Sequence, residues 1–379
     1  MPCRFAGLSC KLLAMSCSNW LRQAIRAVIV SLSISLVPLG AAQLHRINTV
    51  SIGPHRRSWS LLDLSGFFEQ QVMAVTRSGD LLIFSANPNG RWELQRVRGW
   101  DKTKVQLQHL DLPGYFSISE RHNLEALAAN LFITPDGKYA VCVASAEWLK
   151  RIHGKAVGRS TTDNMITVAD LHSFKIANEG RTKEFNLYGA QGVTMDNNGR
   201  LVIDSLAPWP EHRGAFIPLK IPSLEAEARC EYRSLLVKPG EPEHLAAVTS
   251  DSCSKDLKST SVEEYLRPTR PEFQHKFTCQ DTHAEYCPEP TSFTPDRRFG
   301  FGVRTEGHDN FLGSWVETSA TAVAFSMHTH TEIGEIDLMH GNPNLLLTSV
   351  GAHDYLLVLR HGSELTVYAL MDPSSHSAP

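Results

Sequence analysis

The sequence lacks the short motifs that mark the commonest catalytic and nucleotide-binding sites. Its 379 residues contain no GxSxG, GxxxxGKS/T, GxGxxG or HExxH segment, and no CxxC or CxxCH pair that would hold a metal ribbon or a haem. Each of these motifs places a nucleophile, a phosphate cradle or metal ligands at a fixed spacing. Their absence argues against these enzyme classes and leaves only enzymes whose residues come from separate parts of the chain.

The sequence also lacks an excess of positive charge. It has 37 Lys and Arg against 40 Asp and Glu, a formal net charge of −3 and an isoelectric point near 6.6. A nucleic-acid partner is not predicted, because such binding needs a basic domain or a concentrated basic stripe. With 42% hydrophobic residues, the chain has an ordinary globular composition and can bury a large core.

No apolar run is long enough for a comfortable membrane-spanning helix. The longest, residues 27–39, follows Arg22 and Arg26 and ends in the small residues 40–42. This pattern is typical of a secretory signal peptide, so we predict that residues 1–42 are one and that the mature protein is secreted or periplasmic, with no stable membrane span. The alternatives are an uncleaved anchor and a true start at Met15.

The cysteines favour the same compartment. Cys142 stands in an apolar strand and reads as a small buried hydrophobe. Cys230, Cys253, Cys279 and Cys287 crowd one region at spacings of 23, 26 and 8, which do not match a zinc ribbon. We predict two disulfides among these four cysteines, with three connectivities open.

One hairpin pattern recurs along the chain. An apolar strand, a tight turn and a second apolar strand occupy residues 132–143, 193–203 and 292–303. Proline presets φ for the first corner of a turn, Asp or Asn bonds to its own backbone, and Gly accepts positive φ. The chain must double back at each turn, and the apolar alternation of the second strand suits a sheet packed on both faces.

The spacing of the hairpins predicts an all-β propeller. Gly79, Gly137 and Gly199 lie about 60 residues apart, and the remaining intervals give six units of four strands, with seven as the alternative count. The predicted domain spans residues 43–371, followed by a flexible tail at 372–379. An N-terminal strand at 46–52 is available to complete the last blade and close the ring.

Two segments interrupt the repeat. Residues 147–164 form a basic insertion that we predict to be a polar surface loop, and residues 250–272 are polar without clear periodicity. The fourth unit is degenerate, with 245–249 as its opening strand. A weak helical pattern is confined to residues 121–130.

The turn sequences resemble a known repeat family. Ile133-Thr134-Pro135-Asp136-Gly137-Lys138-Tyr139, Val193-Thr194-Met195-Asp196-Asn197-Asn198-Gly199 and Phe293-Thr294-Pro295-Asp296-Arg297-Arg298 are similar to the SPDG hairpin of YVTN and quinoprotein-dehydrogenase-like β-propellers. The resemblance implies a propeller fold. It does not imply an activity, because propellers of this kind serve as lactonases, dehydrogenase subunits, lyases and binding modules.

The densest polar cluster after a predicted strand contains Arg304, Glu306, His308 and Asp309. We take these four residues as the catalytic candidates, because propeller sites lie where loops and strand ends converge. His308-Asp309 and His353-Asp354 are expected at loop or turn positions, where histidine can exchange protons near neutral pH.

A second candidate site is a metal site at His328, His330 and Glu332. Two histidines two residues apart share a face if they stand on a strand, and Glu332 would add a third ligand from that face. The competing interpretation is an ordinary hairpin turn. One divalent metal ion is the only cofactor that this sequence suggests.

Two functions follow from these patterns. The first is a monomeric exported binding or scaffold module that presents a loop-rich face, formed partly by residues 147–164 and 250–290, to a protein or glycan partner. The alternative is a metal-assisted hydrolase or lactonase with residues 304–309 and 328–330 at the central channel.

Overall fold

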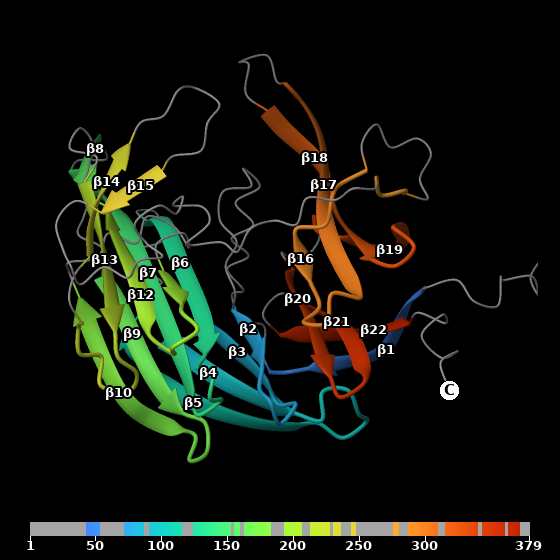
Figure 1. Cartoon of the computed structure of the whole chain (residues 1–379), viewed down its shortest axis with the longest axis horizontal. Coiled ribbons are helices and arrows are strands. Elements are labelled where there is room, and N and C mark those ends of the chain that lie inside the picture. The colour runs from blue at the N-terminus through green and yellow to red at the C-terminus, as the bar shows by residue number, and fades with distance from the viewer. Residues whose placement is uncertain are drawn as a thin grey trace, which may run out of the picture. The chain divides into compact units, whose positions relative to one another are not determined.

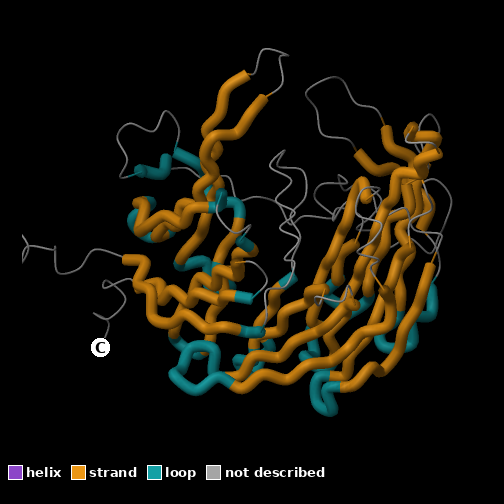
Figure 2. Tube along the Cα trace, turned by 180° about the vertical axis from the view of Figure 1, so that it is seen from behind, coloured by secondary structure: helices purple, strands orange, loops and turns teal. Residues whose placement is uncertain are grey.

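The computed structural model describes only strands, turns and short connections (Figures 1 and 2). No helix of the described part is long and apolar enough to cross a membrane. The described residues are 43–53, 72–86, 91–115, 124–152, 155–159, 163–182, 193–206, 213–227, 230–235, 244–247, 276–279, 287–309, 315–339, 343–360 and 363–371. The predicted signal peptide and the predicted tail lie outside them.

The strands follow one another along the chain with short connections. They are β1 (Gln43–Ser51), β2 (Met73–Val75), β3 (Leu81–Ala86), β4 (Arg91–Arg98), β5 (Gln106–Tyr115), β6 (Leu124–Ile133), β7 (Tyr139–Ile152), β8 (Lys155–Arg159), β9 (Asp163–Asp170), β10 (Lys175–Thr182), β11 (Val193–Met195), β12 (Leu201–Leu206), β13 (Arg213–Leu219), β14 (Cys230–Leu235), β15 (His244–Ala247), β16 (Ser292–Phe293), β17 (Phe299–Asp309), β18 (Trp315–Ser326), β19 (Thr331–Asp337), β20 (Asn344–Val350), β21 (His353–Arg360) and β22 (Glu364–Met371).

These strands form five antiparallel sheets in the described residues. Their orders are β2-β3-β4-β5, β10-β9-β7-β6 with β8 beside β7, β11-β12-β13-β14-β15, β16-β17-β18-β19 and β1-β22-β21-β20. Sequential strands are neighbours within each sheet, which is how the blades of a propeller are built. The all-β class and the four-stranded antiparallel sheets that the sequence predicts are therefore confirmed.

The predicted turn chemistry is confirmed in the Thr-Pro-Asp hairpins. In the second sheet, the Thr134 hydroxyl donates to Asp136 Oδ1 at 2.6 Å and accepts from the Tyr139 amide at 3.0 Å. The fourth sheet repeats this, with Thr294 donating to Asp296 at 2.7 Å and accepting from Phe299 at 3.1 Å. The threonine thus ties both sides of the turn together.

Each hairpin turn needs one residue in the left-handed region. Gly79, Gly137 and Gly199 have φ of 84°, 73° and 78°, and Gly351 has 62°. In the fourth sheet, Arg297 occupies the equivalent position with φ of 57°. A residue with a side chain loses about 1 kcal/mol of stability in this left-handed conformation. Arg297 is thus the exception among these hairpin turns, which otherwise have glycine at this position.

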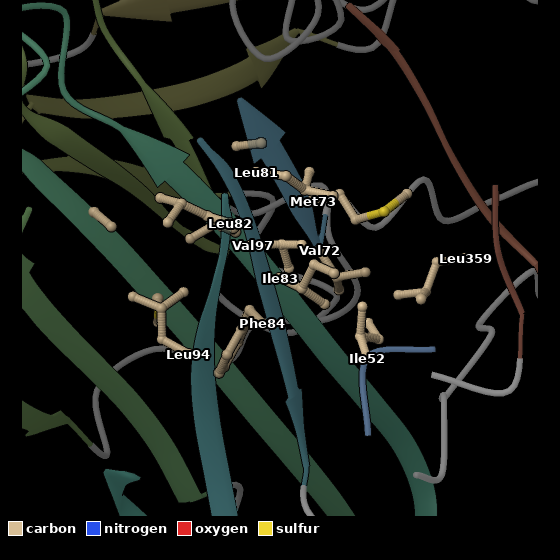
Figure 3. Close-up of a cluster of buried hydrophobic side chains, with 14 of the residues drawn as sticks. Ile52, Val72, Met73, Leu81, Leu82, Ile83, Phe84, Leu94, Val97 and Leu359 are labelled. Carbon is tan, nitrogen blue, oxygen red and sulfur yellow. The ribbon is translucent and has the colours of Figure 1, made fainter. Parts of the chain in front are cut away.

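The N-terminal strand joins the C-terminal sheet, as predicted. β1 is the outer neighbour of β22, and the Ile52 amide donates to the Ser363 carbonyl at 2.8 Å. Ile52 then packs in the main core beside Val72, Ile83 and Leu359 (Figure 3). The first and last sheets are therefore joined by apolar packing as well as by the chain.

Three sequence-based expectations about strands are wrong. Residues 245–247 belong to β15, which pairs with β14 in the third sheet and does not open a fourth unit. Residues 124–130 form β6 where a helical pattern was expected. The insertion at 147–164 is largely β structure, since β7 continues to Ile152 and pairs with β8. Most of the predicted fourth unit lies outside the described residues.

Two of the cysteine predictions have an outcome. Cys279 and Cys287 form a disulfide, and Cys142 is a buried free thiol whose pKa is raised by burial. Cys230 is also disulfide-bonded. Cys253, the fourth cysteine of the predicted set, lies outside the described residues.

Candidate functional site

β17 and β18 extend beyond the four-stranded part of their sheet (Figure 1). β16 pairs only with Gly300 and Phe301 of β17, and β19 pairs with β18 from Thr321 to Ser326. Beyond these points, the strand pairing in the described residues is between residues 305–309 and 315–320, as a two-stranded ribbon, and the Ala320 carbonyl at its base also accepts from the Leu338 amide at 2.8 Å. We call this segment the β17–β18 ribbon.

The four catalytic candidates lie on β17, not in a loop after it. Glu306, His308 and Asp309 are in the β17–β18 ribbon, where His308 pairs with Val316 and Asp309 with Trp315. The expected loop position of His308 and Asp309 is therefore wrong. A bulge between Glu306 and Gly307 interrupts the register, so the alternation of faces breaks within the cluster.

Arg304 is held in an ion pair within its own sheet. Its Nη2 lies 2.8 Å from Glu335 Oε1 on β19, and the pair spans the middle strand β18. The Arg304 side chain is 9% exposed, so this charge pairs with Glu335 and does not project freely into solvent. Glu306 is exposed and accepts a hydrogen bond from the Ser319 hydroxyl at 3.0 Å. These contacts brace the base of the ribbon.

The metal candidates lie at the opposite end of β18 from the β17–β18 ribbon. His328 and His330 are in the turn between β18 and β19, where His330 has φ of 56° and its ring packs 5.3 Å from Phe277. They do not share a strand face, and the Glu332 side chain is buried. Ser319 pairs with Glu306, and Ser326 is the last residue of β18 before the turn. A strand advances about 23 Å between these two serines, and this length of β18 separates the catalytic candidates from the metal candidates.

The structure therefore does not bring the two predicted groups together. Among the described residues, no group of three or more His, Cys, Asp or Glu side chains is placed to hold a metal ion. His353 and Asp354 are also not in a turn, since β21 begins at His353. Asp354 is 2% exposed and pairs with Arg298 at 2.8 Å, and its burial raises its pKa.

A polar cluster on the first sheet escaped the sequence analysis. Glu93 and Gln95 on β4 are 4% and 0% exposed, and Gln95 Nε2 donates to Glu93 Oε1 at 3.2 Å. His109 on β5 pairs with Glu93 through its Nδ1. Gln95 Nε2 also lies 3.4 Å from the Ile52 carbonyl at the end of β1. This cluster links the first sheet to the segment that leaves the last sheet.

A signal for this cluster was present in the sequence. Glu93 and Gln95 stand at alternate positions of a strand, between Trp92 and Leu94 and next to Arg96, so the sequence places both polar side chains on one face of it. Burial of that face is decided by the packing of the sheet. The partner His109 could not be assigned, because cross-strand register is set by the fold.

The hairpin turns of successive sheets touch one another and form a continuous surface. Arg77 donates to the Pro135 carbonyl, and Gly199 lies against the Pro135 ring. These contacts join the turns of the first, second and third sheets.

The same row of turns continues to the fourth and fifth sheets. Gly79 lies against Val350, and Arg298 donates to the Ala352 carbonyl at 3.3 Å. The loop after β4 joins the row because the Trp100 indole donates to the Gly79 carbonyl at 2.8 Å. The turn after β9 joins the row because the Leu171 amide donates to the Lys138 backbone carbonyl at 2.8 Å.

We call this surface the turn face. It consists of the turns and loops at that end of the five sheets: residues 76–80, 99–104, 134–138, 171–175, 196–200, 220–224, 294–298, 327–330 and 351–352. The β17–β18 ribbon and the β7–β8 hairpin lie at the other ends of the strands that leave it.

No family model and no curated protein matches the chain. The solved structures similar to it include TolB from Acinetobacter baumannii, at 9% identity and a TM-score of 0.28 over 79% of this chain and 63% of that one. An uncharacterized protein from Listeria monocytogenes is 8% identical, with a TM-score of 0.30 over 86% of this chain and 87% of that one. The β-propeller domain of the Trilobed protease from Pyrococcus furiosus is 10% identical, with a TM-score of 0.24 over 79% and 83%.

These similarities are too low to carry an inference about function. This chain spans less than two thirds of the TolB chain that it matches. The resemblance to YVTN and quinoprotein-like repeats stays a prediction.

Proposed function

We propose that this protein is an exported β-propeller module that binds a protein or glycan partner through its extended hairpins. The observation that carries this proposal is the β17–β18 ribbon, which continues past the four strands of its sheet. The β7–β8 hairpin is a second extension of the same kind, in place of the predicted loop at 147–164.

Strands that extend beyond their sheet lower the stability of the fold unless a partner binds to them. Each residue fixed in a strand loses about 1 to 2 kcal/mol of backbone entropy, and a ribbon outside the sheet recovers little of it through core burial. Among the described residues no further strand pairs with residues 305–309 or 315–319, so their outer backbone edges can pair with another chain. Partner recognition at such an edge, by strand addition or by contacts to side chains, would offset this cost.

Export and ring closure belong to the same proposal. The signal-like N-terminus and the Cys279–Cys287 disulfide support an oxidising compartment, either outside the cell or in the periplasm. We propose six blades, with seven as the alternative, in a ring closed by β1. The pairing of β1 with β22 supports the closure, and the five described sheets account for five of the proposed blades.

The test removes the β17–β18 ribbon without touching its sheet. In the variant, residues 306–319 are replaced by Asn-Gly, so that the paired residues Thr305 and Ala320 flank a two-residue turn and the register of the sheet is kept. A matched variant shortens the β7–β8 hairpin: residues 151–157 are replaced by Asn-Gly, so that the paired residues Lys150 and Gly158 flank the new turn. The parent and both variants are probed on a glycan array, and their bound proteins are identified after crosslinking in the native compartment.

The expected result is that one or both variants lose defined ligands while keeping the melting temperature of the parent. The proposal fails if both variants keep the same ligands at the same affinity. The hydrolase alternative is tested by elemental analysis of the mature protein. One tightly bound Ca, Zn or Mn per chain, lost in His328→Ala, would favour that alternative.

A further inference from the structure

The two extended hairpins leave their sheets at the same end. β7 and β17 each begin directly after a turn of the turn face and run away from it. β8 pairs with the last residues of β7, and the β17–β18 ribbon contains the last residues of β17. Both hairpins therefore lie at the strand ends opposite the turn face, one in the second sheet and one in the fourth.

The two hairpins have opposite formal charge. The β7–β8 hairpin, residues 149–159, contains no Asp or Glu and has four basic residues: Lys150, Arg151, Lys155 and Arg159. The β17–β18 ribbon, residues 305–320, contains no Lys or Arg and has three acidic residues: Glu306, Asp309 and Glu317. One extension is therefore purely basic and the other purely acidic, and each has a single histidine besides.

Both hairpins also have backbone edges that another strand can join. Residues 149–152 of β7 pair with β8 and with no other strand of the described part of the chain, and the ribbon is two-stranded in the same sense. Opposite charges on neighbouring strands favour their pairing, and like charges oppose it. A ribbon would therefore repel a second ribbon and attract a β7–β8 hairpin.

We propose that the partner of these hairpins is a second copy of this chain, with the ribbon of each copy bound to the β7–β8 hairpin of the other. The inference rests on the proposed function, because it uses the same two extensions. A two-fold axis brings the same surface of both copies together, so that surface must be complementary to itself. A basic and an acidic extension at one end meet this condition, and the expected monomer becomes a symmetric dimer.

The test reverses charges in the full mature chain. The ribbon variant is Asp309→Lys with Glu317→Lys, and the hairpin variant is Arg151→Glu with Lys155→Glu. A third protein combines all four changes. Sedimentation velocity measures the dissociation constant of the dimer over about 1 to 100 µM protein, at about 0.05 M and 0.3 M salt.

A matched control reverses two charges away from both hairpins. Lys102→Glu with Lys104→Glu changes two exposed lysines of the turn face, and it alters the net charge as much as the hairpin variant does. The control should dimerise like the parent, within about twofold, because a loss that follows from total charge alone would affect both proteins equally.

The parent is expected to dimerise, with a dissociation constant that rises with salt. The ribbon variant alone and the hairpin variant alone should each associate at least about a hundredfold more weakly, because like charges then meet. A mixture of the two variants should form a dimer with one copy of each, since every contact is again between opposite charges. The protein with all four changes should dimerise like the parent for the same reason.

Three results overturn the proposal: a parent that stays monomeric over the whole range, a parent dimer whose dissociation constant does not change with salt, and a dimer that both variants keep. A control that dissociates as readily as the hairpin variant does so too. These measurements use the purified chain alone, whereas the proposed function is decided by the ligands that the shortened hairpins lose. A monomeric parent therefore leaves that test unaffected, and the two failures can be told apart.

Discussion

The substitution Thr294→Val tests the hydroxyl that ties the hairpin turn of the fourth sheet. Thr294 is 1% exposed, donates to Asp296 Oδ1 and accepts from the Phe299 amide. Valine has nearly the same shape, so the change removes both hydrogen bonds without opening a cavity. The matched control Thr294→Ser keeps the hydroxyl and loses one methyl group.

The size of the effect follows from these two contacts. A buried amide left without an acceptor costs about 1 to 3 kcal/mol, and the lost bond to a carboxylate adds about 1 kcal/mol. The expected loss for Thr294→Val is therefore about 3 kcal/mol, against about 1 kcal/mol for Thr294→Ser. Unfolding the roughly 330 residues from Leu44 to Met371 gives an entropy near 0.7 kcal/mol/K, so Thr294→Val should melt about 4 °C below the parent in calorimetry.

The pH dependence of this loss is part of the prediction. Burial raises the pKa of Asp296, but the Arg298 amide, the Thr294 hydroxyl and the Arg298 guanidinium outweigh it, so the net pKa is lowered. A lowered carboxyl pKa gives stability that is present above the ordinary carboxyl value and lost as the pH falls through the folded value. The gap between Thr294→Val and the parent should therefore narrow in acid. A Thr294→Val protein as stable as Thr294→Ser at neutral pH would refute the reasoning.

Three further changes test other parts of the fold. Gly302→Ala should lower stability by about 1 to 3 kcal/mol, because its Cβ would overlap the Glu289 carbonyl; an unchanged melting temperature would contradict this close approach. Arg297→Gly should raise stability by about 0.5 to 1 kcal/mol through relief of its positive φ, and a lower melting temperature would argue against strain there. Peptide mapping of the unreduced protein should find Cys230 linked to Cys253, the remaining cysteine of the predicted set; a link to any other cysteine would be inconsistent with that pairing.

The sequence alone determined the hairpin turns and the strands beside them. Thr134, Asp136 and Gly137 act within a few residues of one another, so their chemistry specifies the turn without help from the rest of the chain. The sequence also predicted the N-terminal strand at 46–52 and inferred its partner from the last blade, which it was expected to complete. β1 is found beside β22.

Only the tertiary structure decided which polar residues meet. Glu306 and His328 are close in sequence, yet β18 carries them to opposite ends of one sheet. Glu93 and His109 are brought together by the register of β4 against β5, a non-local choice that depends on which face packs. The turn face likewise exists because five separate hairpins point the same way, and no single turn sequence contains that information.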